Sequence, residues 1–276
     1  MRSSRSAGLL RHPPFALYWV SRILSVGATH ILTVAIGWQL YALTGSALDL
    51  GLVGLVQFVT QIVLTLVVGQ AADRYDRRAI IALCRVVSGV AAAALAVGSL
   101  GGLLTTGRIL ALVAVVGAAR AFEAPTMSAL VASLVSRALV PKAMAWSVSA
   151  NQAARIVAPA LGGVLYVLGP EVVYVVAAAL FIVAGLSAAL IRGAGAVRPR
   201  ESFTLESFFS GVLYIRYSRV LLGLMSLDLF AVLFGGATAL LPIYARDVLQ
   251  TGPWGLGLLR SSPAVGALLT SIVLAR

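Results

Sequence analysis

The chain is 276 residues long, 60% hydrophobic and only 11% charged, and its mean hydropathy is +1.00. A soluble domain carries roughly a quarter charged residues, so this composition excludes a soluble globular protein and favours a membrane protein. The formal net charge is +12. The basic residues lie in the connections between apolar runs and not on one soluble face, so we expect no nucleic-acid binding.

Eight apolar runs have the length that a membrane-spanning helix needs, about 20 residues. They lie near residues 15–43, 48–68, 79–100, 108–133, 143–168, 172–191, 220–244 and 253–274. The connections are short except for residues 193–219, where an amphipathic piece follows Gly, Arg and Pro residues. The sequence predicts an all-α polytopic membrane protein with three parts: a six-helix N-terminal half (1–192), a cytoplasmic linker with a surface helix (193–219), and two helices of a second half (220–276).

The basic residues also predict the orientation of the chain. If the runs alternate in direction, thirteen of them fall on one side of the membrane: Arg2, Arg5, Arg11, Arg74, Arg77, Arg78, Arg137, Lys142, Arg192, Arg198, Arg200, Arg216 and Arg219. The loops on the other side carry only Arg108 and Arg246. Because cytoplasmic loops carry the excess of Lys and Arg, we expect the N-terminus in the cytoplasm.

A charged stretch, residues 69–78, separates the second and third runs. It resembles the signature G-x-x-x-D-R-x-x-R-[RK] of the major facilitator superfamily. The matching residues are Gly69, Asp73, Arg74, Arg77 and Arg78, and Asp76 stands where the family usually has a second glycine. The resemblance implies a gating loop in which Asp73 accepts hydrogen bonds at the start of a neighbouring helix. The alternative is a positively charged cytoplasmic loop with no moving part.

Further segments resemble the enterobactin-exporter-like branch of that superfamily. They are residues 38–41, 44–46, 120–122, 159–163, 227–230 and 240–242. The resemblance implies two six-helix halves around a midplane site in the bacterial inner membrane. The implied function is proton-coupled export of small organic molecules, siderophore- or drug-like, without a cofactor. The chain stops at Arg276, after the eighth run. It is therefore expected to be a fragment or a truncated product, and the alternative function is a non-transporting protein or a half that needs the missing helices or a partner chain.

Ionisable residues inside the runs are candidates for proton coupling, since each is costly within a bilayer. Arg120 and Glu123 lie three residues apart, on one face of the fourth run. Glu123 could exchange a proton as the hydration of a cavity changes, or form a static ion pair with Arg120. Asp228 in the seventh run has no basic neighbour in its own span. It could pair with Arg260 of the eighth run, bind a proton, or bind a cationic group of the substrate.

Other polar residues in the runs are candidates for the substrate cavity. These are His30, Trp38, Asn151, Gln152 and Arg155. Ser21, Ser25, Thr29 and Thr33 form a polar stripe on the first run that could line the cavity or pack against another helix. We expect Arg22 to reach the lipid headgroups, and Arg85 to reach back to Asp73.

The fifth run contains Pro159, Gly162 and Gly163, preceded by Ala158. They resemble an antiporter signature, G-P-x-x-G-G, whose first glycine is alanine here, which favours efflux. Pro159 could bend the helix, and the glycines could let a neighbour approach closely. Cys84 is expected to be a small core residue. The sequence shows no metal-ligand spacing, phosphate-binding glycine loop or nucleophile–base pair, so we expect neither an enzyme nor an ATP-driven pump.

Overall fold

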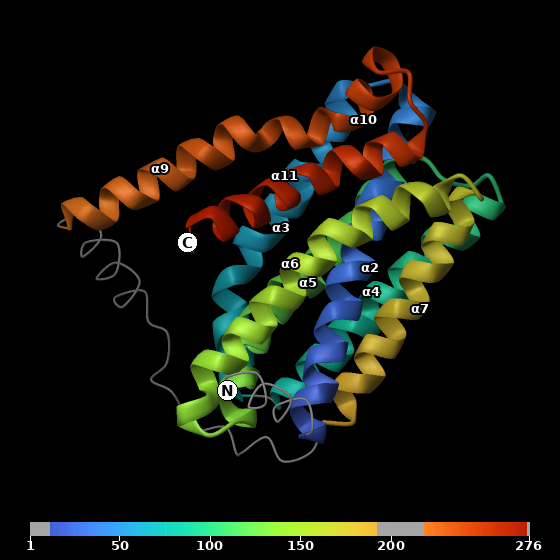
Figure 1. The fold of residues 1–276 in the computed structure, drawn as a ribbon. Helices are drawn as coiled ribbons and strands as arrows, with labels where there is room; N and C mark the ends of the chain where they lie inside the picture. The colour runs from blue at the N-terminus through green and yellow to red at the C-terminus, as the bar shows by residue number, and fades with distance from the viewer. Residues whose placement is uncertain (1–11, 75, 192–217, 275–276) are drawn as a thin grey trace.

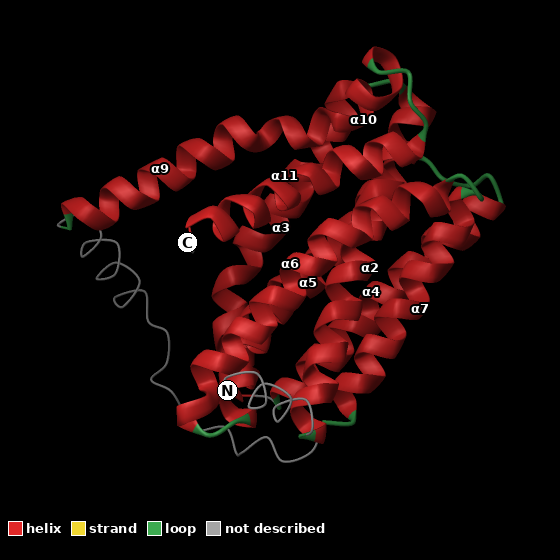
Figure 2. Ribbon diagram, viewed as in Figure 1, coloured by secondary structure: helices red, strands yellow, loops and turns green. Residues whose placement is uncertain are grey.

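The computed structural model describes residues 12–74, 76–191 and 218–274, and these residues are helical with short loops and no strands (Figure 2). The prediction of an all-α bundle is therefore confirmed. The predicted linker, 193–219, lies outside the described residues except for its last two positions.

Among the described residues, six long helices form a bundle, and two further long helices and a short one follow the linker (Figure 1). The bundle consists of α2 (Pro13–Thr44), α3 (Ala47–Arg74), α4 (Arg77–Leu100), α5 (Thr106–Leu134), α6 (Val140–Tyr166) and α7 (Pro170–Ala189). The later helices are α9 (Arg219–Gly235), the short α10 (Leu241–Ile243) and α11 (Pro253–Leu274). Within the described residues, five helices are long and apolar enough to cross a membrane: α2, α3, α4, α5 and α7.

The predicted seventh span, 220–244, is not one continuous α-helix. The α9 helix ends at Gly235, and a 3-10 segment (Gly236–Leu240), α10 and a π-helical segment (Tyr244–Val248) follow it. Two successive glycines weaken helix propensity at the first break. Pro242 removes a backbone donor beyond it. The sequence predicts one span here because the run is mostly apolar, and apolarity alone does not detect these breaks.

The α2 helix lies at the centre of the bundle, between α6 and α7 (Figure 1). The α4 helix packs against α7 and α5, and α3 packs against α5. Small and branched side chains fill the core between α2, α4 and α7: for example, Ala28, Leu32, Ala92 and Leu95 are at most 2% exposed. The α11 helix runs along α6, outside this core.

The charged stretch between α3 and α4 is more helical than the sequence suggested. We had expected the helix to end near Gly69, but α3 continues to Arg74 and α4 begins at Arg77. Asp76 caps α4: its Oδ1 accepts a hydrogen bond of 3.0 Å from the backbone N–H of Arg78. The side chains of residues 65–75, among them Gly69, Asp73 and Arg74, lie outside the described part of the structure.

Arg78 connects the start of α4 to the end of α7. Its guanidinium donates a 2.7 Å hydrogen bond to the backbone carbonyl of Ile191 and pairs with Asp76 at 3.0 Å. This pair holds the pKa of the Asp76 carboxyl below its usual value, chiefly through the side-chain hydrogen bond from Arg78. Asp76, which stands in place of a family glycine, is thus a helix cap.

The α6 and α11 helices touch backbone to backbone through glycines. A Cβ added to Gly163 would lie 2.5 Å from the carbonyl oxygen of Pro253, and one added to Gly257 would lie 2.5 Å from that of Pro159. Gly162 lies close to α2, where an added Cβ would be 3.0 Å from Ile31 Cα. The close approach expected from these glycines is therefore observed, and α6 continues through Pro159 as one helix.

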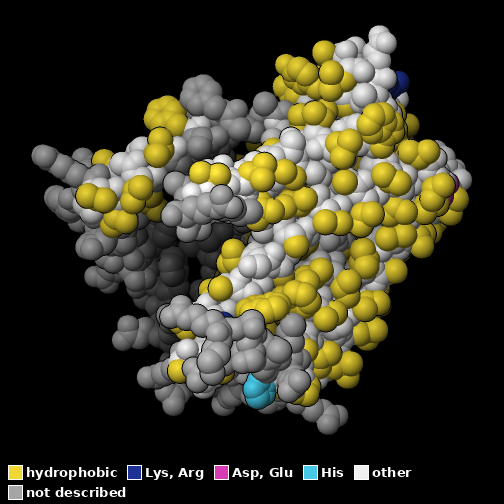
Figure 3. Space-filling view, viewed as in Figure 1, with side chains coloured by type: hydrophobic (Ala, Val, Ile, Leu, Met, Phe, Trp, Pro, Cys, Tyr) yellow, Lys and Arg dark blue, Asp and Glu magenta, His cyan; other side chains and the backbone are white. Residues whose placement is uncertain are grey.

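The outer surface is apolar, as a membrane protein requires. Exposed branched side chains cover the outer sides of α6 and α7, among them Val157, Leu161, Val164, Val175 and Val183. Hydrophobic side chains dominate the face shown in Figure 3, over α6, α7 and α11, with almost no charged ones.

Replacing Gly257 with Ala should destabilise the protein by about 1–3 kcal/mol, the usual range for overpacking, because the new methyl group meets the α6 backbone. Gly266→Ala on the same helix is the matched control, since its Cβ meets nothing within 4 Å. Thermal unfolding in detergent measures both. Equal melting temperatures for the two variants would contradict the close packing of α6 and α11.

Replacing Asp76 with Ala should cost about 0.5–2 kcal/mol through the lost helix cap, whereas Asp76→Asn should retain most of the capping. Because the folded-state pKa of Asp76 is lowered, its ion-pair contribution is present above the unfolded pKa and is lost as the pH falls through the folded pKa. The difference in melting temperature between the wild type and Asp76→Ala should therefore shrink in acid. A difference that is unchanged down to about pH 3, below the usual Asp pKa, would contradict this account.

Candidate functional site

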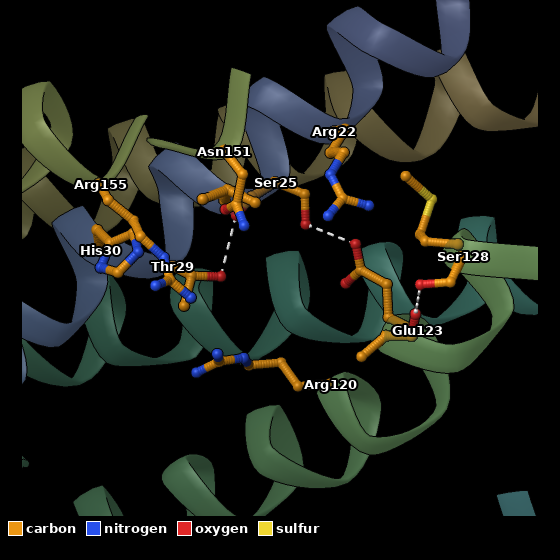
Figure 4. A pocket seen from close by; sticks show the side chains of 12 residues that line it. Arg22, Ser25, Thr29, His30, Arg120, Glu123, Ser128, Asn151 and Arg155 are labelled. Atoms are coloured by element: carbon orange, nitrogen blue, oxygen red, sulfur yellow. Dashed lines mark hydrogen bonds between the residues drawn. The ribbon is translucent and has the colours of Figure 1, made fainter. Parts of the chain in front are cut away.

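A cavity of about 270 Å³ lies between α2, α5 and α6. Three helices provide its lining, and many of the lining side chains are polar (Figure 4). They are Arg22, Ser25, Val26, Thr29 and His30 from α2, Arg120, Glu123, Ala124, Met127 and Ser128 from α5, and Asn151 and Arg155 from α6. We call this space the central cavity.

The hydroxyl stripe on α2 both packs and lines the cavity. The Thr29 hydroxyl donates to the backbone carbonyl of Ser25 at 2.9 Å, and that of Thr33 donates to the carbonyl of Thr29 at 2.7 Å. Such bonds back to the preceding turn satisfy the hydroxyl donors without a partner helix. The Ser21 hydroxyl is buried and donates to the Ala184 carbonyl of α7 at 2.6 Å. Spacing alone had left the two roles of the stripe open.

The strongest polar interaction at the cavity is an ion pair between α4 and α5. Arg85, with no exposed surface, donates from Nε and Nη2 to Oε1 of Glu123 at 3.0 and 2.9 Å. The Ser25 hydroxyl donates to the same oxygen at 2.9 Å. Arg85 also donates to the Ser21 hydroxyl and, at 3.1 Å, to the Ala184 carbonyl. One guanidinium thereby joins α4 to α2, α5 and α7.

This pair corrects two expectations. One of the two alternatives for Glu123 is a static ion pair with Arg120 on its own helix face, and Arg85 is expected to reach Asp73. Within the described part of the chain, Glu123 instead forms its ion pair with Arg85, and Arg120 forms none. The sequence did hold a signal for this: Arg85 is the only charged residue inside the third run, and Glu123 is the only carboxylate well inside the first six.

Four candidates for proton coupling or the substrate cavity meet in the central cavity beside Glu123: His30, Arg120, Asn151 and Arg155. Two others lie elsewhere. Trp38 packs edge-on against Tyr166, with ring centroids 6.4 Å apart. Gln152 donates a 3.0 Å hydrogen bond to the backbone carbonyl of Ala264 on α11.

Arg22 also differs from expectation. We had placed it at the lipid headgroups, but it lines the central cavity, and its Nη1 donates to the Tyr18 hydroxyl at 3.3 Å. Its Nε is buried without a hydrogen-bond partner. A position near the end of an apolar run predicts snorkelling, but the direction of a side chain depends on which helix face is internal.

A second cavity of about 180 Å³ lies further along α2. Thr33 and Gly37 of α2, Gln57 of α3, Thr238 and Arg260 are among its lining residues. The Nη2 atom of Arg260 lies 3.3 Å from the position that a Cβ on Gly37 would take. Arg260 thus contacts α2; the side chain of Asp228, its expected partner, lies outside the described residues.

The described residues contain no group of three or more His, Cys, Asp or Glu side chains that could hold a metal ion. Cys84 is a buried free cysteine.

Replacing Arg85 with Met should cost about 3–5 kcal/mol, because it leaves the partly buried Glu123 carboxylate without its cation. The double variant Arg85→Met with Glu123→Leu should cost less than the sum of the two single changes, since no unpaired charge remains. Thermal unfolding of the wild type, the two single variants and the double variant gives a double-mutant cycle. Additivity within about 0.5 kcal/mol would mean that the two side chains do not interact.

Comparison with known proteins shows which proteins this chain resembles. The model of a protein family described as "transmembrane secretion effector" matches residues 4–276 of this chain. Macrolide efflux protein A of Streptococcus pyogenes is 23% identical over 266 residues, which cover 94% of this chain and 65% of that protein. The corresponding protein of Streptococcus pyogenes serotype M6 gives the same figures.

Among solved structures, a bacterial homologue of the human lysosomal transporter Spinster, in an inward-facing and unoccupied conformation, superposes with a TM-score of 0.71 at 16% identity. The superposition covers 99% of this chain and 63% of that structure. Because the match to the macrolide efflux protein covers 65% of that protein, this chain spans a little under two thirds of both relatives. This likeness and the described helices show an all-α bundle of the major facilitator type. The chain belongs to the transmembrane secretion effector family.

Proposed function

We propose that this chain forms the transport pathway of a secondary active exporter for small organic molecules, siderophore- or drug-like. The observation that carries the proposal is the central cavity, a polar space inside a bundle whose outer surface is apolar. Charged side chains inside membrane helices are costly and mark substrate or ion pathways. The macrolide efflux relative supports export over uptake.

The proposed mechanism is alternating access, in which two helical halves rock around a central site. In this chain, α11 belongs to the second half and α6 to the first. Their glycine contact, Gly163 against Gly257, provides a smooth backbone surface without interlocking side chains. Pro159, beside that contact, lacks a backbone donor and is a candidate bending point of α6.

The charged stretch between α3 and α4 is a candidate gate. Arg78 ties the start of α4 to the end of α7, so a movement of one helix end pulls on the other. We propose that Gly69, Asp73, Arg74 and Arg77 act with it on the cytoplasmic side of a bacterial inner membrane. The positive-inside distribution of Lys and Arg supports this orientation.

We propose Glu123 as the proton-coupling carboxylate. It lines the cavity, and the three hydrogen bonds from Arg85 and Ser25 end on one of its oxygens, Oε1. A proton that enters from cavity water would neutralise the carboxylate, weaken its attraction for Arg85 and loosen the contact of α4 with α5. Arg120, one turn earlier on α5, and Asp228 on α9 are the further candidates in the coupling path.

The test is flux in proteoliposomes that contain the full chain, with an imposed pH gradient and a panel of macrolides, siderophores and dyes as probes. We expect Glu123→Gln to abolish the dependence of export on the gradient, because glutamine cannot exchange a proton. Glu171→Gln at the start of α7 removes a carboxylate outside the central cavity and is the matched control.

If Glu123→Gln and Asp228→Asn both left pH-driven export unchanged, the coupling assignment would be wrong. If the wild type carried no probe in either direction from a panel of macrolides, siderophores and dyes, the transporter assignment itself would fail.

A further inference from the structure

We infer that the central cavity selects amphipathic organic anions, with a carboxylate or phosphate group, over cations of the same size. This inference rests on the proposed transport function and names the class of substrate that the site would take. The inference is based on the charge of the lining, which contains three guanidinium groups, those of Arg22, Arg120 and Arg155, and one carboxylate, that of Glu123.

That single carboxylate is already compensated. Arg85, which lies behind the cavity wall and is not part of the lining, pairs with Glu123 at 2.9 Å. The Arg85–Glu123 pair is neutral as a unit, so the three lining guanidiniums give the cavity an uncompensated charge of +3, with His30 counted as neutral.

The three guanidiniums come from three helices, α2, α5 and α6, and their side chains reach into one space (Figure 4). Within the described residues, Arg120 and Arg155 have no ion pair within 4 Å. Among the described residues, Arg22 donates only to the neutral hydroxyl of Tyr18, and its Nε is buried without a partner there. The exposed guanidiniums of Arg120 and Arg155 therefore offer hydrogen-bond donors to a ligand in the cavity.

Unpaired cations that line one cavity repel one another, and an anion between them removes both the repulsion and the unmet hydrogen bonds. Guanidinium is planar and presents a fork of donors that matches carboxylate and phosphate oxygens in pairs. A cationic substrate would add a further like charge to the cavity and meet no free carboxylate there.

The basic lining continues beyond the central cavity. Arg260 lines the second cavity, and its Nε is buried there without a hydrogen-bond partner among the described side chains. The two cavities follow one another along α2, with His30 in the first and Thr33 in the second. An anion that leaves the central cavity in this direction would meet another guanidinium.

The apolar part of the lining indicates the rest of the ligand. Val26, Ala124 and Met127 border the guanidiniums in the central cavity. Ile36 and Val53 do so in the second. A ligand with an acidic group and an apolar body satisfies both kinds of surface, whereas a small inorganic anion leaves the apolar part in contact with water.

The test is binding to the purified full chain in neutral detergent, measured by fluorescence anisotropy. Carboxyfluorescein and rhodamine 6G share a xanthene ring system but carry opposite charge at neutral pH. We expect carboxyfluorescein to bind more tightly, and Arg120→Gln and Arg155→Gln each to weaken its binding about tenfold or more, roughly the loss of one charge-assisted contact. Arg155→Lys, which keeps the charge, should retain part of the binding.

Arg108→Gln is the matched control, because it removes the same charge from an exposed position near the start of α5. Equal or tighter binding of rhodamine 6G, or a loss in Arg120→Gln and Arg155→Gln no larger than in Arg108→Gln, would overturn the inference. Melting temperatures confirm that each variant is folded. Because binding needs no pH gradient, a failure here leaves export testable, and a failure of export leaves anion binding testable.

Discussion

The ion pair between Arg85 and Glu123 is the interaction on which the interior of the bundle depends. Arg85 has no exposed surface, and its guanidinium reaches groups on α2, α5 and α7. A buried charge without a partner destabilises a fold strongly, so the position of Glu123 on α5 and that of Arg85 on α4 constrain each other. The polar wall of the central cavity is held in place by this pair.

The same pair explains the electrostatic character of the cavity. Among the described residues, Glu123 is the only carboxylate in the lining, and Arg85 neutralises it from behind. The other guanidiniums are left facing open space. A membrane interior offers them no counter-ions, so their charge has to be stabilised by hydration in the cavity or by a bound anion.

The fold was predictable from the sequence because the length of an apolar run and the positions of basic residues are properties of whole segments. The six bundle helices lie where the apolar runs lie, although α3 extends through the charged stretch. The site was only partly predictable. His30, Arg120, Glu123, Asn151 and Arg155 do meet, but helical spacing within α5 suggested the pair Arg120–Glu123, whereas the observed partner comes from α4. Contacts between helices depend on rotation about each axis, which spacing within one helix does not determine.

The most direct test of the account is whether water reaches the central cavity but not the outer face of α6. Cys84 is the single cysteine, so a Cys84→Ala background allows one new thiol at a time. Asn151→Cys places it in the cavity lining, and Val164→Cys places it on the exposed apolar side of the same helix. Labelling by a charged, water-soluble thiol reagent in intact membranes should be fast at position 151 and slow at position 164. Equal labelling at the two positions, or none at position 151, would contradict a water-filled pathway through this bundle.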